Sequence, residues 1–85
     1  MKVAYTPAFI KQFNTLSKEL QEEVLAKIEL FKDRNNHKML KVHKLHGKHS
    51  SKYSFSIDYK NRIVFMYLTK QEIICLFIGD HDIYK

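Results

Sequence analysis

The chain is poor in the residues that interrupt or cross-link small folds. Its 85 residues include one cysteine, one proline, two glycines and no tryptophan. A single cysteine excludes a disulfide within the chain, which is typical of reducing compartments. So few glycines and prolines, beside 45% hydrophobic residues, exclude a largely disordered chain. No apolar run has membrane-spanning length, and the first residues lack the apolar segment of a secretory signal. We therefore expect a single domain over residues 1–85, located in the cytoplasm and without a membrane partner.

Acidic residues are also in the minority. Nine aspartates and glutamates stand against fifteen lysines and arginines, so the formal net charge is +6. At this length such an excess favours polyanionic partners, with nucleic acid first and acidic proteins second. A lysine-rich surface that contacts only water gives the same composition, so the charge alone does not decide between these interpretations.

The first half of the chain has the pattern of a short strand followed by two helices. Residues 2–5 are β-prone and predict the strand. Thr6 followed by Pro7 predicts a helix start, because a capping hydroxyl precedes a proline whose missing N–H costs nothing there. Ser17 predicts the cap of a second helix, which ends at Asn35 and Asn36. The apolar residues at helical spacing are Phe9, Ile10, Phe13 and Leu16 in the first helix, and Leu20, Val24, Ile28 and Phe31 in the second.

The second half has the pattern of three consecutive strands. Residues 37–52 are basic and rich in histidine, and we expect a loop or an irregular approach to the sheet there. Apolar residues then alternate with polar ones over 53–57 and run continuously over 63–68 and 73–78. Turn-prone residues separate these stretches, which predicts an antiparallel meander. The predicted fold class is α+β in the order β-α-α-β-β-β, an antiparallel sheet with an αα-hairpin packed on one face.

Two polar groups that lie far apart in the sequence should meet at one edge of this sheet. Arg62 begins the central strand, and the last strand runs into Gly79 and then His81. Adjacent antiparallel strands place the end of one beside the start of the other, so we expect Arg62 near His81. An imidazole gives or takes a proton near neutral pH. The phenol of Tyr84, three positions further on, can bind a phosphate or stack on a base. This edge therefore predicts acid–base chemistry on an anionic substrate.

Four segments carry a resemblance to a known family. They are residues 45–48 (Leu-His-Gly-Lys), 53–59 (Tyr-Ser-Phe-Ser-Ile-Asp-Tyr), 61–65 (Asn-Arg-Ile-Val-Phe) and 78–84 (Ile-Gly-Asp-His-Asp-Ile-Tyr). Together with the element order they resemble the RelE/ParE superfamily of toxins, and most of all its YafQ-type branch. The resemblance implies a RelE-like fold and a ribonuclease that cuts messenger RNA in the ribosomal A site. It also implies silencing by a cognate antitoxin protein, with operator DNA bound only through the antitoxin complex.

The resemblance also implies roles for particular residues. His81 matches a histidine that works as acid or base in the YafQ-type motif, and Tyr84 matches an aromatic residue that contacts the nucleotide at the cut. Arg62 matches an arginine that contacts the scissile phosphate. His43 aligns with a loop histidine of the YafQ branch, and His46 takes a basic position close by. RelE itself presents lysines at the positions of two serines here, Ser54 and Ser56.

The chemistry of RNA cleavage explains why such residues would serve. RNA carries its own nucleophile, so a metal-free nuclease needs a base for the 2′-hydroxyl, cations for the phosphate and an acid for the 5′-oxygen. We hypothesise that Arg62 binds the phosphate, that His81 protonates the leaving oxygen and that His43 or His46 activates the 2′-hydroxyl. Tyr84 would stack on the nucleotide or bond to it. The products would be a 2′,3′-cyclic or 3′-phosphate and a 5′-hydroxyl, with neither metal nor cofactor.

The basic segment and the proposed catalytic residues also have simpler interpretations. His81 could be a turn residue bonded to a neighbouring aspartate, and Arg62 could form a surface ion pair with Asp58. The lysines are the expected footprint on ribosomal RNA, through sequence-blind phosphate contacts, but a solvated loop would look the same. They are Lys38, Lys41, Lys44, Lys48 and Lys52.

Two other functions remain open from the sequence. The first is a ParE-like poison that acts on DNA gyrase by protein contact and needs no catalytic histidine. The second is a degenerate toxin that only binds its antitoxin as a co-repressor.

Overall fold

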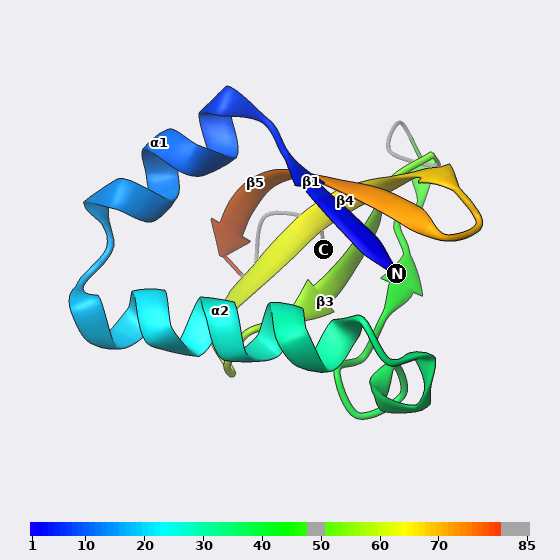
Figure 1. The fold of residues 1–85 in the computed structure, drawn as a ribbon, viewed down its shortest axis with the longest axis horizontal. Coiled ribbons are helices and arrows are strands. Elements are labelled where there is room, and N and C mark those ends of the chain that lie inside the picture. The colour runs from blue at the N-terminus through cyan, green and yellow to red at the C-terminus, as the bar shows by residue number, and fades with distance from the viewer. Residues whose placement is uncertain (48–50, 81–85) are drawn as a thin grey trace.

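The computed structural model describes residues 1–47 and 51–80, which form two helices against a five-stranded sheet (Figure 1). The predicted α+β class is confirmed. Neither helix has both the length and the hydropathy that crossing a bilayer requires, within this described part of the chain. The elements in chain order are β1 (Lys2–Tyr5), α1 (Pro7–Thr15), α2 (Lys18–Phe31), the 3₁₀ turn η1 (Arg34–Asn36), β2 (His43–Lys44), β3 (Tyr53–Ser56), β4 (Asn61–Thr69) and β5 (Glu72–Asp80).

The sheet is mixed, with strand order β1-β5-β4-β3-β2. The predicted meander of β3, β4 and β5 is antiparallel, as expected. The first strand differs from a wholly antiparallel sheet, because β1 lies at the far edge and pairs parallel with β5, with Val3 opposite Ile73. A parallel pair needs a long crossover, and the two helices and the remaining strands supply it. Figure 1 places the N-terminus beside the β4–β5 hairpin, where the Lys2 N–H donates to the Gln71 carbonyl at 2.8 Å.

The basic segment over 37–52 is less irregular than its sequence predicts. It contains the edge strand β2, which pairs antiparallel with β3 and places His43 opposite Ser54 and Lys44 opposite Tyr53. Two residues are too few to show a strand period, so the sequence carried no signal for this element.

Both helix starts lie where their capping residues predict. The Thr6 side chain accepts from the Phe9 N–H at 3.0 Å, and its hydroxyl donates to the Leu76 carbonyl at 2.7 Å. The Ser17 hydroxyl accepts from the Leu20 N–H at 3.2 Å. The first cap therefore also ties α1 to β5, and each cap satisfies an amide that the helix itself leaves without a partner.

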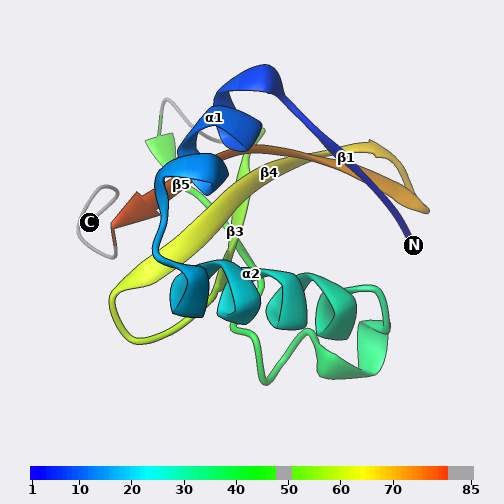
Figure 2. The same cartoon turned by 60° about the vertical axis from the view of Figure 1, so that its left-hand side comes forward.

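The core lies between the two helices and one face of the sheet. Phe31 is its centre, with ring centroids 4.6 Å from Phe55, 5.1 Å from Phe65 and 4.3 Å from His37. Strand side chains alternate between faces, so Ser54 and its neighbours two residues apart point to the opposite side. Figure 2 shows the twisted sheet with both helices in the same view. The buried members of the core are Phe9, Val24, Ile28, Phe31, Leu40, Phe55, Ile57, Ile63, Phe65, Ile73 and Cys75.

Candidate active site

Arg62 lies where the strand pattern predicts. It is the second residue of β4 and pairs with Ser56 on one side and with Gly79 of β5 on the other. The side chain is half-buried. The start of β4 is thus beside the end of β5, two residues before His81. His81 and Tyr84 lie outside the described residues, so the meeting of Arg62 with His81 stays a prediction.

The turn that leads into β4 is built around one carboxylate. Asp58 Oδ1 accepts from the Lys60 N–H at 2.8 Å and the Asn61 N–H at 2.7 Å. Burial alone would raise the pKa of Asp58, but these hydrogen bonds, the Asn61 side chain and the charge of Lys27 together lower it. The suggested ion pair between Asp58 and Arg62 is not formed. Among the described residues the ion pairs are Lys27–Glu23 and Lys32–Glu29.

A glutamine from α1 holds the end of strand β5 in place. Gln12 donates through Nε2 to the Ile78 carbonyl at 3.1 Å, and its Oε1 accepts from the Ile78 N–H at 2.8 Å. A side chain that satisfies both groups of one strand residue replaces a missing strand neighbour. This holds the residue just before Gly79 in place. No sequence pattern pointed to Gln12, because a polar residue on a surface helix is ordinary.

His43 is held in one orientation by the backbone of its own segment. Its Nδ1 donates to the Lys41 carbonyl at 2.8 Å, which leaves the lone pair on Nε2. Lys41 has a φ of 57°, a left-handed conformation outside a regular strand or helix. Nε2 faces the Ser54 hydroxyl at 3.5 Å, and Ser54 is fully buried. With Nδ1 used as a donor, Nε2 is the ring atom that can accept a proton, and its long contact with the Ser54 hydroxyl is the one that a substrate hydroxyl would replace.

His43 and Arg62 share one face of the sheet, the face opposite the helices. His43 pairs with Ser54, Arg62 pairs with Ser56, and paired residues point to the same side. Two strand spacings and a two-residue offset put their Cα atoms about 12 Å apart. No described hydrogen bond joins the two side chains, and Cα atoms at this separation leave room for a phosphodiester between them.

The other predicted binding residues have no described contact with Arg62. His46 is exposed beyond the end of β2, and no described contact joins it to Arg62. Lys38, Lys41 and Lys44 are exposed, and Lys52 is half-buried with its carbonyl accepting from the Leu45 N–H at 2.8 Å. Lys48 lies outside the described residues. The basic segment thus presents its described lysines from one short stretch around β2.

The remaining reactive groups do not add to this site. Cys75 is buried, and burial raises the pKa of its thiol to about 12, so it stays protonated near neutral pH. Within residues 1–47 and 51–80, no group of three histidine, cysteine, aspartate or glutamate side chains is close enough to hold a metal ion.

Solved structures of toxins share this fold. RelE in the archaeal RelE–RelB complex from Pyrococcus horikoshii matches with a TM-score of 0.73 and 15% identity, over 96% of each chain. YafQ from Escherichia coli matches with a TM-score of 0.71 and 15% identity, over 94% of this chain and 92% of that one. The toxin–antitoxin complex RelBE2 from Mycobacterium tuberculosis matches with a TM-score of 0.68 and 12% identity, over 94% and 96%.

These matches confirm the predicted RelE-like fold. No protein-family model and no curated protein sequence matches the chain. The architecture is thus that of RelE-type and YafQ-type toxins, while the sequence has diverged far from each of those three chains.

Proposed function

We propose that this chain is the toxin of a type II toxin–antitoxin system and that it cleaves messenger RNA on the ribosome, in the cytoplasm. The observation that carries the proposal is the shared sheet face of Arg62 and His43, at the edge where β5 runs toward His81. The likeness to RelE and YafQ structures supports the same function. The net charge of +6 supports a polyanionic substrate.

The proposed mechanism needs no metal ion. His43 takes the 2′-hydroxyl proton on Nε2, the atom that its bond to the Lys41 carbonyl leaves with a lone pair. The 2′-oxygen then attacks the phosphorus, and the guanidinium of Arg62 stabilises the charge that grows on the phosphate oxygens. The bond to the 5′-oxygen breaks as His81 donates a proton to it. Tyr84 positions the nucleotide, and the exposed lysines Lys38, Lys41 and Lys44 bind ribosomal RNA together with Lys48 and Lys52.

The direct test is induced expression with primer extension on a translated reporter message. We expect cuts inside translated codons with the wild type and none with Arg62→Ala, while Lys18→Ala, an exposed lysine at the start of α2, should cut normally. Growth arrest with intact messages and a DNA-damage response would instead indicate a gyrase poison. Absence of any arrest would indicate a degenerate toxin that only binds a partner.

We also propose an antitoxin as the partner, with operator DNA contacted only through the complex. A cavity of about 200 Å³ between β1, α1 and α2 has an almost wholly apolar lining. Two aliphatic side chains there are exposed, Ile10 by 48% and Leu25 by 52%. An acidic amphipathic segment fits both this apolar cavity and the basic surface. The cavity is lined by Tyr5, Phe9, Ile10, Phe13, Leu25 and Ile28.

A further inference from the structure

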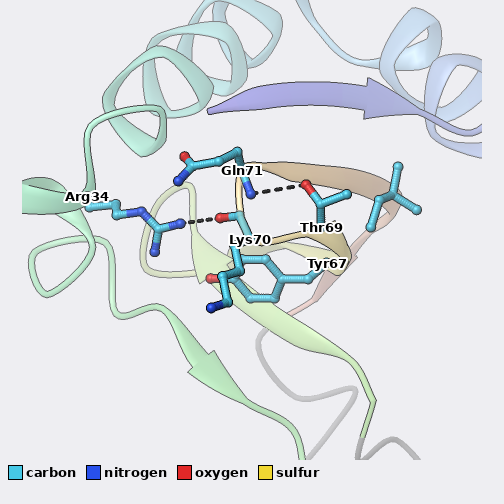
Figure 3. A pocket seen from close by; sticks show the side chains of 6 residues that line it. Arg34, Tyr67, Thr69, Lys70 and Gln71 are labelled. Carbon is cyan, nitrogen blue, oxygen red and sulfur yellow. Dashed lines mark hydrogen bonds between the residues drawn. The ribbon is translucent and has the colours of Figure 1, made fainter.

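A cationic cavity lies at the end of β4 opposite Arg62. It has a volume of about 620 Å³ and forms where η1 approaches the hairpin between β4 and β5 (Figure 3). The sequence gives no reason to link its parts, because Arg34 and Lys70 are 36 residues apart. The cavity is lined by Arg34, Tyr67, Leu68, Thr69, Lys70 and Gln71.

Arg34 is fixed across this cavity by a single hydrogen bond. Its Nη2 donates to the Lys70 carbonyl, as the dashed line in Figure 3 shows. A guanidinium has five N–H donors, so this bond orients the group and leaves donors for a ligand. The nearby Asp33 carboxylate accepts from the Asn35 N–H at 2.9 Å instead. Neither ion pair formed among the described residues involves Arg34 or Lys70.

Two hydroxyl groups border the same space. Tyr67 packs edge-on against Tyr53, with centroids 5.0 Å apart and an interplanar angle of 87°. Burial raises the pKa of Tyr67, and the positive charge of Arg34 acts in the opposite direction, which places that charge near the phenol. Thr69 Oγ1 accepts from the Gln71 N–H at 3.1 Å and keeps its own proton for donation. A guanidinium, an ammonium and two hydroxyls form a set of donors suited to a phosphate.

We propose that this cavity is a second phosphate-binding site, which holds the backbone of RNA away from the cleavage site. The anion chemistry follows from the cavity itself, while the choice of RNA rests on the proposed function. The lining includes no acidic residue, and its apolar part comes from Leu68 and the ring of Tyr67. An acidic amphipathic helix of a protein partner fits better the almost wholly apolar cavity beside Ile10 and Leu25.

The two phosphate sites bind different parts of the RNA. Arg62 is the second residue of β4 and Thr69 is the last, so seven residue steps, roughly 23 Å, separate them. Neighbouring phosphates of one dinucleotide cannot reach both sites. The hairpin site therefore adds affinity and orientation without contacting the bond that is cut, and its loss should lower binding and leave the chemistry of cleavage intact.

The test is binding of a fluorescein-labelled 2′-O-methyl RNA, whose blocked 2′-oxygen prevents cleavage, to the full chain by fluorescence anisotropy. We expect Arg34→Ala and Lys70→Ala each to weaken binding about three- to tenfold. Each should also lower the slope of log affinity against log salt by about 0.7. The matched control is Lys18→Ala, an exposed lysine of α2 outside this cavity, which should bind like the wild type. Circular dichroism of each variant checks folding, and Lys70→Ala leaves the backbone carbonyl that holds Arg34.

Three results would overturn the site. Unchanged affinity in both variants is one, and an equal loss in Lys18→Ala is another, because it would mean only general charge attraction. The third is a poly-glutamate peptide that binds as tightly as the RNA and loses as much affinity in Arg34→Ala, which would assign the cavity to an acidic protein. The primer-extension test is independent of these results. If the wild type cleaves messages but RNA affinity does not depend on Arg34 or Lys70, the hairpin site alone is refuted. If RNA affinity depends on these residues but no message is cleaved, the proposed function alone is refuted.

Discussion

An arginine lies at each end of β4, Arg62 within the strand and Arg34 from η1, and the two have different surroundings. At the start of the strand, Arg62 shares a sheet face with His43 and lies beside the end of β5. At the far end, Arg34 reaches the Lys70 carbonyl from a separate segment, and no histidine or carboxylate lines that cavity. The two guanidiniums have the same charge and different neighbours.

This difference teaches how to separate catalysis from binding on one small surface. A cation beside a group that accepts protons can stabilise the charge that develops during a reaction, so its removal lowers the rate. A cation without such a neighbour stabilises bound anion in the ground and transition states alike, so its removal lowers affinity and salt dependence. The experiments below set these two effects against each other.

The largest expected effect is on stability, from a substitution in the core that supports both ends of β4. Phe31 stacks on Phe55 and contacts Phe65 edge-on, and it has no exposed surface. Phe31→Ala should lower the free energy of unfolding by about 3–5 kcal/mol, which is a large part of the stability of so small a domain. Urea unfolding followed by circular dichroism measures this. Leu30→Ala, at a neighbouring exposed position, should cost far less, and an equal cost would mean that Phe31 is not the centre of the core.

The next effect separates the two arginines. Arg62→Lys keeps the charge but loses the two-pronged contact with phosphate, so cleavage should fall by about 10²–10³-fold. Binding of the uncleavable RNA should change little. Arg34→Lys serves as the matched change at the other end, where cleavage by enzyme saturated with message should stay near wild type. Equal losses of cleavage in both variants would contradict the division of roles.

His43 should matter for the pH dependence of the rate at the Arg62 end. His43→Gln removes the group that accepts a proton on Nε2, and we expect cleavage to fall by about 10²-fold. The acidic limb of the pH–rate profile should disappear with it, because that limb reports protonation of the base. His46→Gln is the control, since His46 is exposed and no described hydrogen bond orients its ring as the Lys41 carbonyl orients that of His43. Loss of the limb in His46→Gln alone would assign the base to that histidine instead.

The sequence was informative wherever local chemistry decides the structure. The caps at Thr6 and Ser17, the helical stripes and the three-strand meander follow from capping groups and from spacing. The neighbourhood of Arg62 and Gly79 also followed, because an antiparallel turn fixes which residues meet.

The sequence did not predict the features that depend on contacts between distant segments. The parallel pairing of β1, the two-residue strand at His43 and the meeting of Arg34 with Lys70 all depend on how the helices and the sheet pack. The sequence of residues 34–36 predicts only the end of a helix, with no contact to the β4–β5 hairpin. The tautomer of His43 likewise depends on the left-handed backbone of Lys41, which no local pattern predicts.

The smallest expected effect is on the stability of the turn that leads into β4 just before Arg62. The pKa of Asp58 is lowered in the fold, because its hydrogen bonds from the turn outweigh burial, so the carboxylate stabilises the protein above its unfolded pKa of about 3.9 and less as pH falls through the folded value. Asp58→Asn should cost about 1 kcal/mol near neutral pH, and the difference from wild type should shrink as pH falls through the lowered folded pKa of Asp58. Urea midpoints across this pH range measure it. RNA affinity that depends on Arg34 should not change, since the hairpin cavity lies at the opposite end of β4. A stability difference that stays constant with pH would mean that the shape of the side chain, and not its charge, holds the turn.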